Sequence, residues 1–260
     1  PDTSEFNVNV STLQDSECNF ITDDNFSQLV AESLSADPVN GGSVPVFGLM
    51  KDWDVSRVTD FSSAFFVKST FNGDISGWDT SGATNMEMMF FAASDFNQDL
   101  NSWDVSNVTN MTNMFNAATD FNGDVSNWDV SSVANMSSMF REASDFNKDI
   151  SSWVVSSVTN MSYMFKQASD FNQNISSWDV SQVTSMTEMF RDASDFNQDI
   201  GAWNVSNVTG MGMYAMFWGA TDLEQDLSGW CVTNITSEPI NFGLNSGLTS
   251  GDYPVWGTCP

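Results

Sequence analysis

One arrangement of hydrophobic and polar residues recurs along most of the chain at intervals of 25 residues. In the copy that spans residues 121–143, Trp128 and Val130 flank one polar residue, and this period of two predicts a short strand with two side chains inward and one outward. Met136, Met139 and Phe140 follow at spacings of three and four, which predict one face of a helical turn. The interval is marked by a row of tryptophans: Trp53, Trp78, Trp103, Trp128, Trp153, Trp178 and Trp203.

Each repeat is therefore expected to contain one short strand, one short helical turn and two corners. A threonine such as Thr109 or Thr159 precedes most of the helical turns and is predicted to cap them. A unit this short cannot bury its own apolar face, so stacked units must bury Trp on Trp, Met on Met and Phe on Phe. The pattern predicts a repeat solenoid in which these side chains form the core and not a cofactor site.

The repeats occupy residues 48–230, as about eight units, and the two ends of the chain depart from them. Two extra residues within Met211–Met216 delay the last tryptophan of the array to Trp230. A solenoid exposes its core at both ends unless it is capped, so residues 1–47 and 231–260 are predicted to be caps, beyond which the repeats do not continue.

One helix is expected in the N-terminal cap. Its apolar residues fall on one side over about residues 24–35, Asp23-Asp24-Asn25 is predicted to cap it, and Asp37-Pro38 to end it.

The charge balance restricts the partners. The chain has 34 acidic and 7 basic residues, a net charge of −27, which repels nucleic acid and anionic membranes and favours cationic partners. Solubility alone is the simpler explanation of this charge. No apolar run approaches the roughly 18 residues that span a bilayer, so no membrane span is expected.

Three cysteines lie near the ends of the chain. Cys231 and Cys259 share the C-terminal segment and are predicted to form a disulfide that closes the last turn, which implies an oxidising, extracellular environment. Two reduced thiols are the alternative. Cys18 is then either buried and free or bonded outside this chain.

One unit orders its apolar residues as Val125-x-x-Trp128-x-Val130-x-x-Val133-x-x-Met136-x-x-Met139-Phe140-x-x-Ala143. This order resembles the repeat of BspA-like leucine-rich-repeat surface proteins, and most closely a sub-family of bacterial and algal surface proteins with Phe-Asn-x-Asp and Trp-Asp-Val-Ser-x-Val-Thr-x-Met-x-x-Met-Phe units. The resemblance implies a right-handed α/β solenoid, with short parallel strands on one face and short helical turns on the other. It also implies surface attachment, and it brings no catalytic motif.

The residue types argue against catalysis. The chain has no histidine, which removes the usual general base, the Ser-His-Asp and Cys-His arrangements and most zinc sites. It has no phosphate-binding loop and no Gly-x-Gly-x-x-Gly motif between a strand and a helix. Paired carboxylates can perform acid–base chemistry, but here they are repeated and not uniquely placed. The chain is not expected to be an enzyme.

The outward position of the predicted strand carries a row of acidic residues. Adjacent carboxylates in a parallel sheet, about 4.8 Å apart, repel by roughly 0.9 kcal/mol in water, which bound calcium can offset. Simple solvation explains this row, and a ligand- or cation-binding surface is the alternative, for which the metal candidates are Asp79, Asp104 and Asp129. The ligand-binding candidates are Asp79, Asp104, Asp129, Asp179 and Asn204, the last of which interrupts the row, as Val154 does.

The corners carry further polar rows, which we interpret as mainly structural. Corner aspartates favour turns in which the carboxylate accepts backbone N–H groups. An asparagine row is predicted to bond from unit to unit. Most Asn-x-Ser/Thr sequons arise from the repeat itself, so the glycosylation candidates are Asn9 and Asn25, outside it. The corner row is Asp74, Asp99, Asp124, Asp149, Asp199 and Asp226, and the asparagine row is Asn72, Asn97, Asn122, Asn147, Asn172 and Asn197.

Two functions follow from these features. The first is a secreted or cell-surface recognition or adhesion protein that presents its acidic face to a protein or glycan of a cell surface or matrix. The second is a structural component of a matrix, wall or filament, which self-associates with divalent cations as bridges. Calcium is the one cofactor that the sequence suggests.

Overall fold

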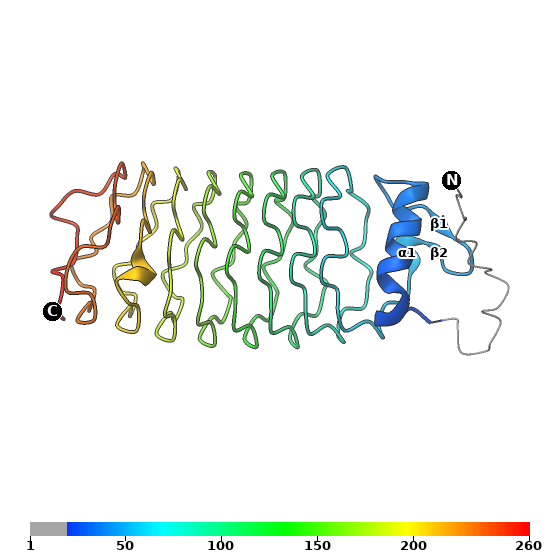
Figure 1. Ribbon diagram of the computed structural model, residues 1–260, viewed down its shortest axis with the longest axis horizontal. Helices are drawn as coiled ribbons and strands as arrows, with labels where there is room; N and C mark the ends of the chain where they lie inside the picture. Colours follow the sequence, from blue (N-terminus) through cyan, green and yellow to red (C-terminus); the bar gives the residue numbers. More distant parts are fainter. Residues whose placement is uncertain (1–19) are drawn as a thin grey trace, which may run out of the picture.

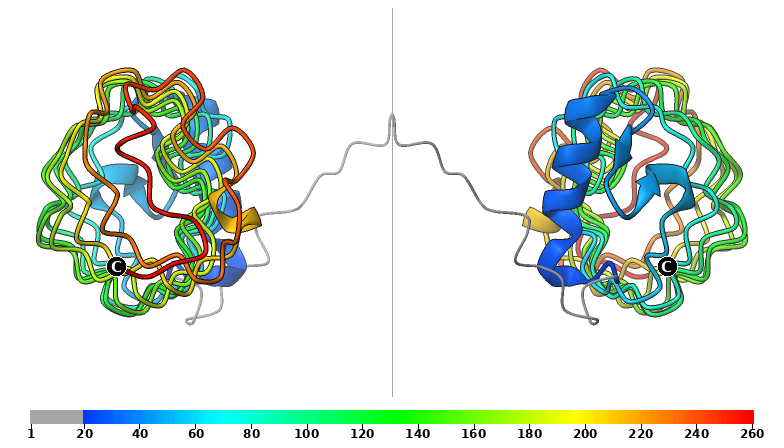
Figure 2. Two further views of the ribbon diagram at one scale, coloured as in Figure 1. Left: turned by 90° about the vertical axis from the view of Figure 1, so that its left-hand side faces the viewer. Right: turned by 90° about the vertical axis from the view of Figure 1, so that its right-hand side faces the viewer.

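The computed structural model describes residues 20–260, which form a solenoid of stacked coils with a helix at the N-terminal end (Figure 1). Viewed along the long axis, the coils follow one another in nearly the same closed outline (Figure 2). We call each 25-residue coil a rung. The regular elements among the described residues are helix α1 (Asp23–Ala36), strands β1 (Ser43–Val44) and β2 (Gly48–Leu49), and the 3-10 turns η2 (Met50–Asp52) and η3 (Met211–Met213).

The Trp-x-Val segment is not the predicted strand. Trp128 and Val130 are buried and Asp129 is exposed, so the predicted alternation of side chains is present. The backbone nevertheless closes local turns, in which Trp128 N–H donates to the Val125 carbonyl (3.2 Å) and Val133 N–H to the Val130 carbonyl (2.9 Å). The prediction fails because N–H groups that close turns cannot also form a ladder between strands.

The Met-x-x-Met-Phe segment is not the predicted helical turn either. Met139 N–H donates to the Met136 carbonyl within the rung (3.2 Å), whereas Phe140 N–H donates to the Met164 carbonyl of the next rung (2.9 Å). Ser138, which lies between Met136 and Met139, has a φ of 56°, a left-handed conformation that an α-helix excludes. The three apolar side chains are still fully buried, as predicted.

Parallel pairing between rungs occurs just before this segment. Threonine hydroxyls support it, since Thr159 Oγ1 donates to the Ala134 carbonyl (3.2 Å) and Thr184 Oγ1 to the Thr159 carbonyl (3.1 Å). The predicted capping role is therefore wrong at Thr109 and Thr159, because these hydroxyls bond to the preceding rung, whereas Thr209 Oγ1 accepts the Gly212 N–H (3.4 Å) at η3. The bridges pair Asp60 with Asn85, Asn85 with Asn110, Asn110 with Asn135, Asn135 with Asn160, and Asn160 with Ser185.

Aromatic side chains stack along the core. The rings of Trp78 and Trp103 lie 6.4 Å apart and almost parallel, and phenylalanines stack in the same way. Each tryptophan also links two rungs, because the indole N–H of Trp128 donates to the buried Leu100 carbonyl of the preceding rung (2.8 Å) and that of Trp153 to Val125 (3.1 Å). The solenoid core predicted from the sequence is thus present.

The asparagine row bonds from rung to rung, as predicted. Its partners are backbone groups and not stacked amides: Asn122 N–H donates to Asn97 Oδ1 (2.8 Å), and Asn147 N–H to Asn122 Oδ1 (3.1 Å). Gln98 adds a bond to Asn72 Oδ1 (2.8 Å). These bonds fix the register of adjacent rungs.

Helix α1 covers the core at the N-terminal end. Thr22 is its N-cap, and Asn25 Oδ1 accepts the Thr22 N–H (2.9 Å), so the cap begins one residue before the predicted Asp23-Asp24-Asn25. Phe26 packs edge-on against Phe61 (5.1 Å) and Trp78 (5.7 Å). The amide of Asn25, a glycosylation candidate, is engaged in this cap.

The C-terminal segment contains the predicted disulfide between Cys231 and Cys259. In the same segment, Phe242 packs edge-on against Tyr253 (5.4 Å) and Trp256 (5.1 Å). Cys18 and Asn9 lie outside the described residues. No helix within residues 20–260 is long and apolar enough to cross a membrane.

Candidate functional site

The aspartates predicted to bind a ligand are exposed beside the stacked tryptophans, on what we call the Asp face, the surface of the Trp-Asp-Val segments. Each one bonds first to its own rung. Asp104 Oδ1 accepts the N–H (3.0 Å) and the hydroxyl (2.6 Å) of Ser106, and Asn204 makes the same two bonds to Ser206. Asp79 and Asp179 likewise bond to the serine two residues further on. These side chains therefore stabilise turns.

Hydrogen bonding also lowers the pKa values of two aspartates in this row, Asp104 and Asp129. The Ser106 hydroxyl, then its N–H, holds the pKa of Asp104 below its usual range, against small opposing effects of burial and of Asp129. The Ser131 hydroxyl and N–H lower the pKa of Asp129 in the same way. No three acidic or cysteine side chains among residues 20–260 converge to hold a metal ion. Asp79, Asp104 and Asp129, the predicted metal ligands, therefore do not form such a cluster.

The rung in which Val154 replaces aspartate adjoins a shallow hollow on the Asp face, of roughly 490 Å³. Trp128, Asp129 and Ser152 contribute to its lining. Asp129 is the one charged group there, and its carboxylate already accepts the Ser131 N–H (3.0 Å). Its other polar lining residues are Ser126, Asn127, Ser131 and Ser152, and the Ser152 hydroxyl already donates to the Ser126 carbonyl (2.8 Å).

A second surface, the turn face, is formed by the Met-x-x-Met-Phe segments and the residue after each phenylalanine. The side chain at that last position changes along the solenoid. Phe66 and Phe91 stack at 5.1 Å near the N-terminal end, and the Arg191 guanidinium lies 4.0 Å from the ring centre of Trp218 near the other. In chain order the row is Phe66, Phe91, Asn116, Arg141, Lys166, Arg191 and Trp218.

The turn face also contains the irregular rung. Met213 and Met216 are fully buried at the usual spacing, and Met186 N–H bonds to the Gly212 carbonyl (2.7 Å), so the two extra residues are Gly210 and Met211. The sequence pattern places them only within Met211–Met216, because Met211 looks like the first methionine of the motif. It is instead 78% exposed, in η3.

Glycine is required where this bulge rejoins the rung. A Cβ atom on Gly212 would lie 2.6 Å from the Thr184 carbonyl oxygen and 3.0 Å from Val208 Cγ1. Only a residue without a side chain lets the backbone approach the neighbouring rung this closely.

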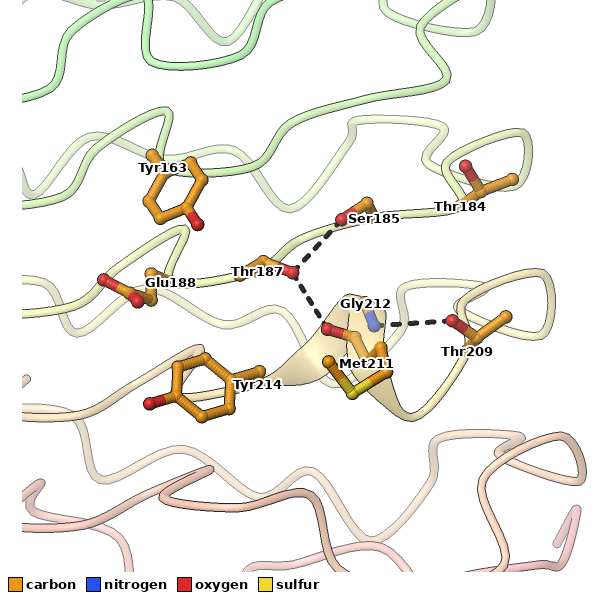
Figure 3. Close-up of a pocket in the computed structure, with 9 residues that line it drawn as sticks. All are labelled: Tyr163, Thr184, Ser185, Thr187, Glu188, Thr209, Met211, Gly212 and Tyr214. Carbon is orange, nitrogen blue, oxygen red and sulfur yellow. Dashed lines mark hydrogen bonds between the residues drawn. The ribbon is translucent and has the colours of Figure 1, made fainter.

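The bulge borders a groove of roughly 460 Å³, which we call the Met211 groove (Figure 3). Tyr163, Glu188 and Tyr214 lie one above another on three successive rungs at one side of it. Met211 and hydroxyl side chains form the rest, and Thr187 Oγ1 donates to the Met211 carbonyl (2.9 Å). The hydroxyls are those of Thr184, Ser185, Thr187 and Thr209.

Glu188 is the centre of a charge network at this groove. Its Oε2 accepts Lys166 Nζ (2.7 Å) and Arg191 NH1 (3.0 Å), and its side chain is only 10% exposed. Burial alone raises the pKa of Glu188, but hydrogen bonds and charge from Lys166 and Arg191 outweigh it and lower the pKa. Lys166 also lies 5.6 Å from the ring centre of Tyr163. The network fixes a carboxylate and a ring at the groove.

Sequence reasoning did not identify this groove. Its residues occupy positions that vary between repeats, so no single position marks them. Two signals were present: the break in the 25-residue spacing at Gly210-Met211, and the register that places Tyr163 and Glu188 on adjacent rungs.

Stacked rungs with continuous aromatic and Asn/Gln ladders define a solenoid repeat protein. The chain belongs to the family described as Mycoplasma protein of unknown function, DUF285, which matches residues 43–153 and 134–246. No curated protein and no solved structure matches the chain significantly.

Proposed function

We propose that this protein is a recognition protein, without catalytic activity, that binds a partner on a cell surface or in the extracellular matrix through its turn face. One observation carries the proposal: the side chains that build the coil recur from rung to rung, whereas the residues between the two methionines of each turn-face segment differ. Tyr163, Glu188 and Tyr214 are among these variable residues and line the Met211 groove. A repeat protein can set its binding specificity at positions where folding does not require one particular residue type.

Rigidity supports this role. Rung-to-rung bonds hold the backbone of the groove, since Glu188 N–H donates to the Tyr214 carbonyl (2.9 Å) and Tyr163 N–H to the Thr187 carbonyl (2.8 Å). A preformed surface loses little conformational entropy on binding. The two ion pairs of Glu188 hold its side chain in one position as well.

The remaining features fit an extracellular location. The Cys231–Cys259 disulfide is typical of oxidising environments. The net charge of −27 disfavours nucleic acid. The resemblance to BspA-like leucine-rich-repeat surface proteins supports surface attachment, and with it the right-handed arrangement typical of those repeats.

Direct binding tests the proposal. The fluorescently labelled chain is applied to immobilised glycans, to matrix proteins and to intact cells at moderate ionic strength. We expect saturable binding to at least one of these surfaces, which excess unlabelled chain displaces. Absence of saturable binding on all three would contradict the proposal.

A further inference from the structure

The lining of the Met211 groove is rich in hydroxyl groups and has no unpaired charge. Threonine, serine and tyrosine supply the hydroxyls, and Glu188 is the one carboxylate. Lys166 and Arg191 neutralise that carboxylate at 2.7 Å and 3.0 Å. A ligand of strong positive or negative charge therefore finds no free counter-charge here. An uncharged ligand with hydroxyl donors finds acceptors, because the Thr184 and Thr187 hydroxyls donate to the Thr159 and Met211 carbonyls and keep acceptor capacity of their own.

Glu188 leaves one acceptor free for such a ligand. Both cations bond to Oε2, and Oε1 has no hydrogen-bond partner within residues 20–260. No side-chain oxygen or nitrogen in this part of the chain is both fully occluded and unpaired, so Oε1 is accessible. A charged acceptor on a side chain nine-tenths buried gains from a hydroxyl donor, because charge-assisted bonds are the strong ones.

Tyr214 and Met211 provide an apolar surface beside that acceptor. The Tyr214 ring is half-buried, and among the described residues it stacks on no aromatic ring and no cation. Met211 lies next to it in η3, exposed to solvent (Figure 3). Aromatic rings with a few well-placed polar groups are typical of small-molecule sites, and roughly 460 Å³ is within their usual size.

We propose that the Met211 groove binds a pyranose ring of an uncharged oligosaccharide, an inference that rests on the proposed recognition function. The C–H face of the sugar packs on Tyr214 and Met211. One sugar hydroxyl donates to Glu188 Oε1, and another donates to Thr187 Oγ1, whose own proton is bonded to the Met211 carbonyl. A sugar combines an apolar face with a rim of hydroxyls, which matches this arrangement of groups better than a peptide does.

Titration of the full chain with neutral cello-, malto-, manno- and galacto-oligosaccharides tests the site. Calorimetry measures affinity, and the NMR signal of the Met211 methyl group, with methionines ¹³C-methyl labelled, reports its location. We expect at least one sugar to bind and to shift that signal. Tyr214→Ala is expected to weaken binding at least tenfold and Tyr214→Phe to preserve most of it, while Met88→Ala, on the turn face outside the groove, changes nothing.

The outcomes separate this inference from the proposed function. If the chain binds cells or matrix proteins but none of these sugars, the sugar site is refuted and the recognition function stands. If a sugar binds without shifting the Met211 methyl signal, the site is also refuted. This readout uses the wild-type chain, so it holds even if the Tyr214→Ala variant does not fold. If the chain binds neither the surfaces nor the sugars, both proposals fail.

Discussion

At the scale of single residues, the repeat separates the groups that build the coil from those free to vary. Asp104 binds the turn at Ser106, and Asn204 performs the same task without a charge. Burial of Trp128 and exposure of Asp129 follow from their alternation in the sequence. The turn role of the aspartates was not predicted, because the same alternation also fits a strand whose outward residue faces solvent.

The charge of Asp104 makes its turn dependent on pH. Its pKa is lowered in the folded chain by the Ser106 hydroxyl and N–H, so its contribution is present above the unfolded value of about 3.9 and is lost as pH falls through the lower folded value. Asp104→Asn keeps both bonds, as Asn204 does, and does not titrate. We expect the stability difference between wild type and Asp104→Asn to shrink below about pH 4 in urea unfolding. A difference that stays constant from pH 7 to about pH 2.5 would refute this role.

The indole N–H of Trp128 is expected to contribute to the free energy of unfolding through its hydrogen bond to the preceding rung. Trp128→Phe removes the 2.8 Å hydrogen bond to the buried Leu100 carbonyl, which keeps the Trp103 N–H (3.0 Å) as a partner, so we expect a cost of about 0.5–1.5 kcal/mol in unfolding free energy in addition to lost packing. The matched control is Trp256→Phe, in the C-terminal segment, whose indole N–H donates no hydrogen bond within residues 20–260. Urea unfolding followed by circular dichroism measures both variants. A loss of unfolding free energy in Trp256→Phe equal to or larger than that in Trp128→Phe would contradict the role of this hydrogen bond.

At the scale of elements, the unit is a ladder of turns and not a strand and a helix. The spacing of Met136, Met139 and Phe140 predicts their burial correctly, but the same spacing on a turn with a left-handed residue gives the same burial. Nothing about Ser138 itself predicts a φ of 56°, since its conformation is set by the bonds of its neighbours to the next rung. Periodicity therefore predicted which residues face inward and did not predict the backbone path.

Gly212 is expected to be essential for the bulge at η3. Gly212→Ala places a Cβ against the Thr184 carbonyl and should displace η3, while Gly229→Ala, whose Cβ meets only Gly201 O at 3.7 Å, is the matched control. Amide hydrogen exchange should accelerate around residues 209–216 in Gly212→Ala alone. Unchanged protection there would show that the close approach is not required.

The disulfide is expected to hold the C-terminal segment on the core. Its cysteines are separated by 28 residues, for which loop entropy predicts about 3–4 kcal/mol of stabilisation. In Cys231→Ser/Cys259→Ser, hydrogen exchange should rise over residues 231–260 and stay unchanged near Trp128, with Cys18→Ser as the control. An equal rise in hydrogen exchange over residues 231–260 and near Trp128 would show that the disulfide does not act locally.

At the scale of the molecule, the regular solenoid is interrupted at the rung that contains η3 and borders the Met211 groove. The sequence predicted the solenoid and its core from the tryptophan spacing, but it directed attention to the Asp face, where the departures from aspartate are most visible. The Met211 groove depends on which rungs become neighbours: Lys166 and Glu188 are 22 residues apart and meet at 2.7 Å only through the stacking register. Sequence periodicity therefore predicts the scaffold, whereas the groove depends on contacts between rungs that the periodicity does not specify.

We propose that the turn face, and not the Asp face, recognises the partner. The most direct test compares two double variants with wild type in binding to intact cells and immobilised glycans. Met211→Ser/Tyr214→Ser alters the groove, and Asp79→Asn/Asp104→Asn removes two charges from the Asp face while keeping the turn bonds. We predict at least a tenfold loss of affinity for the groove variant and near wild-type binding for the Asp-face variant. The reverse result would contradict the claim.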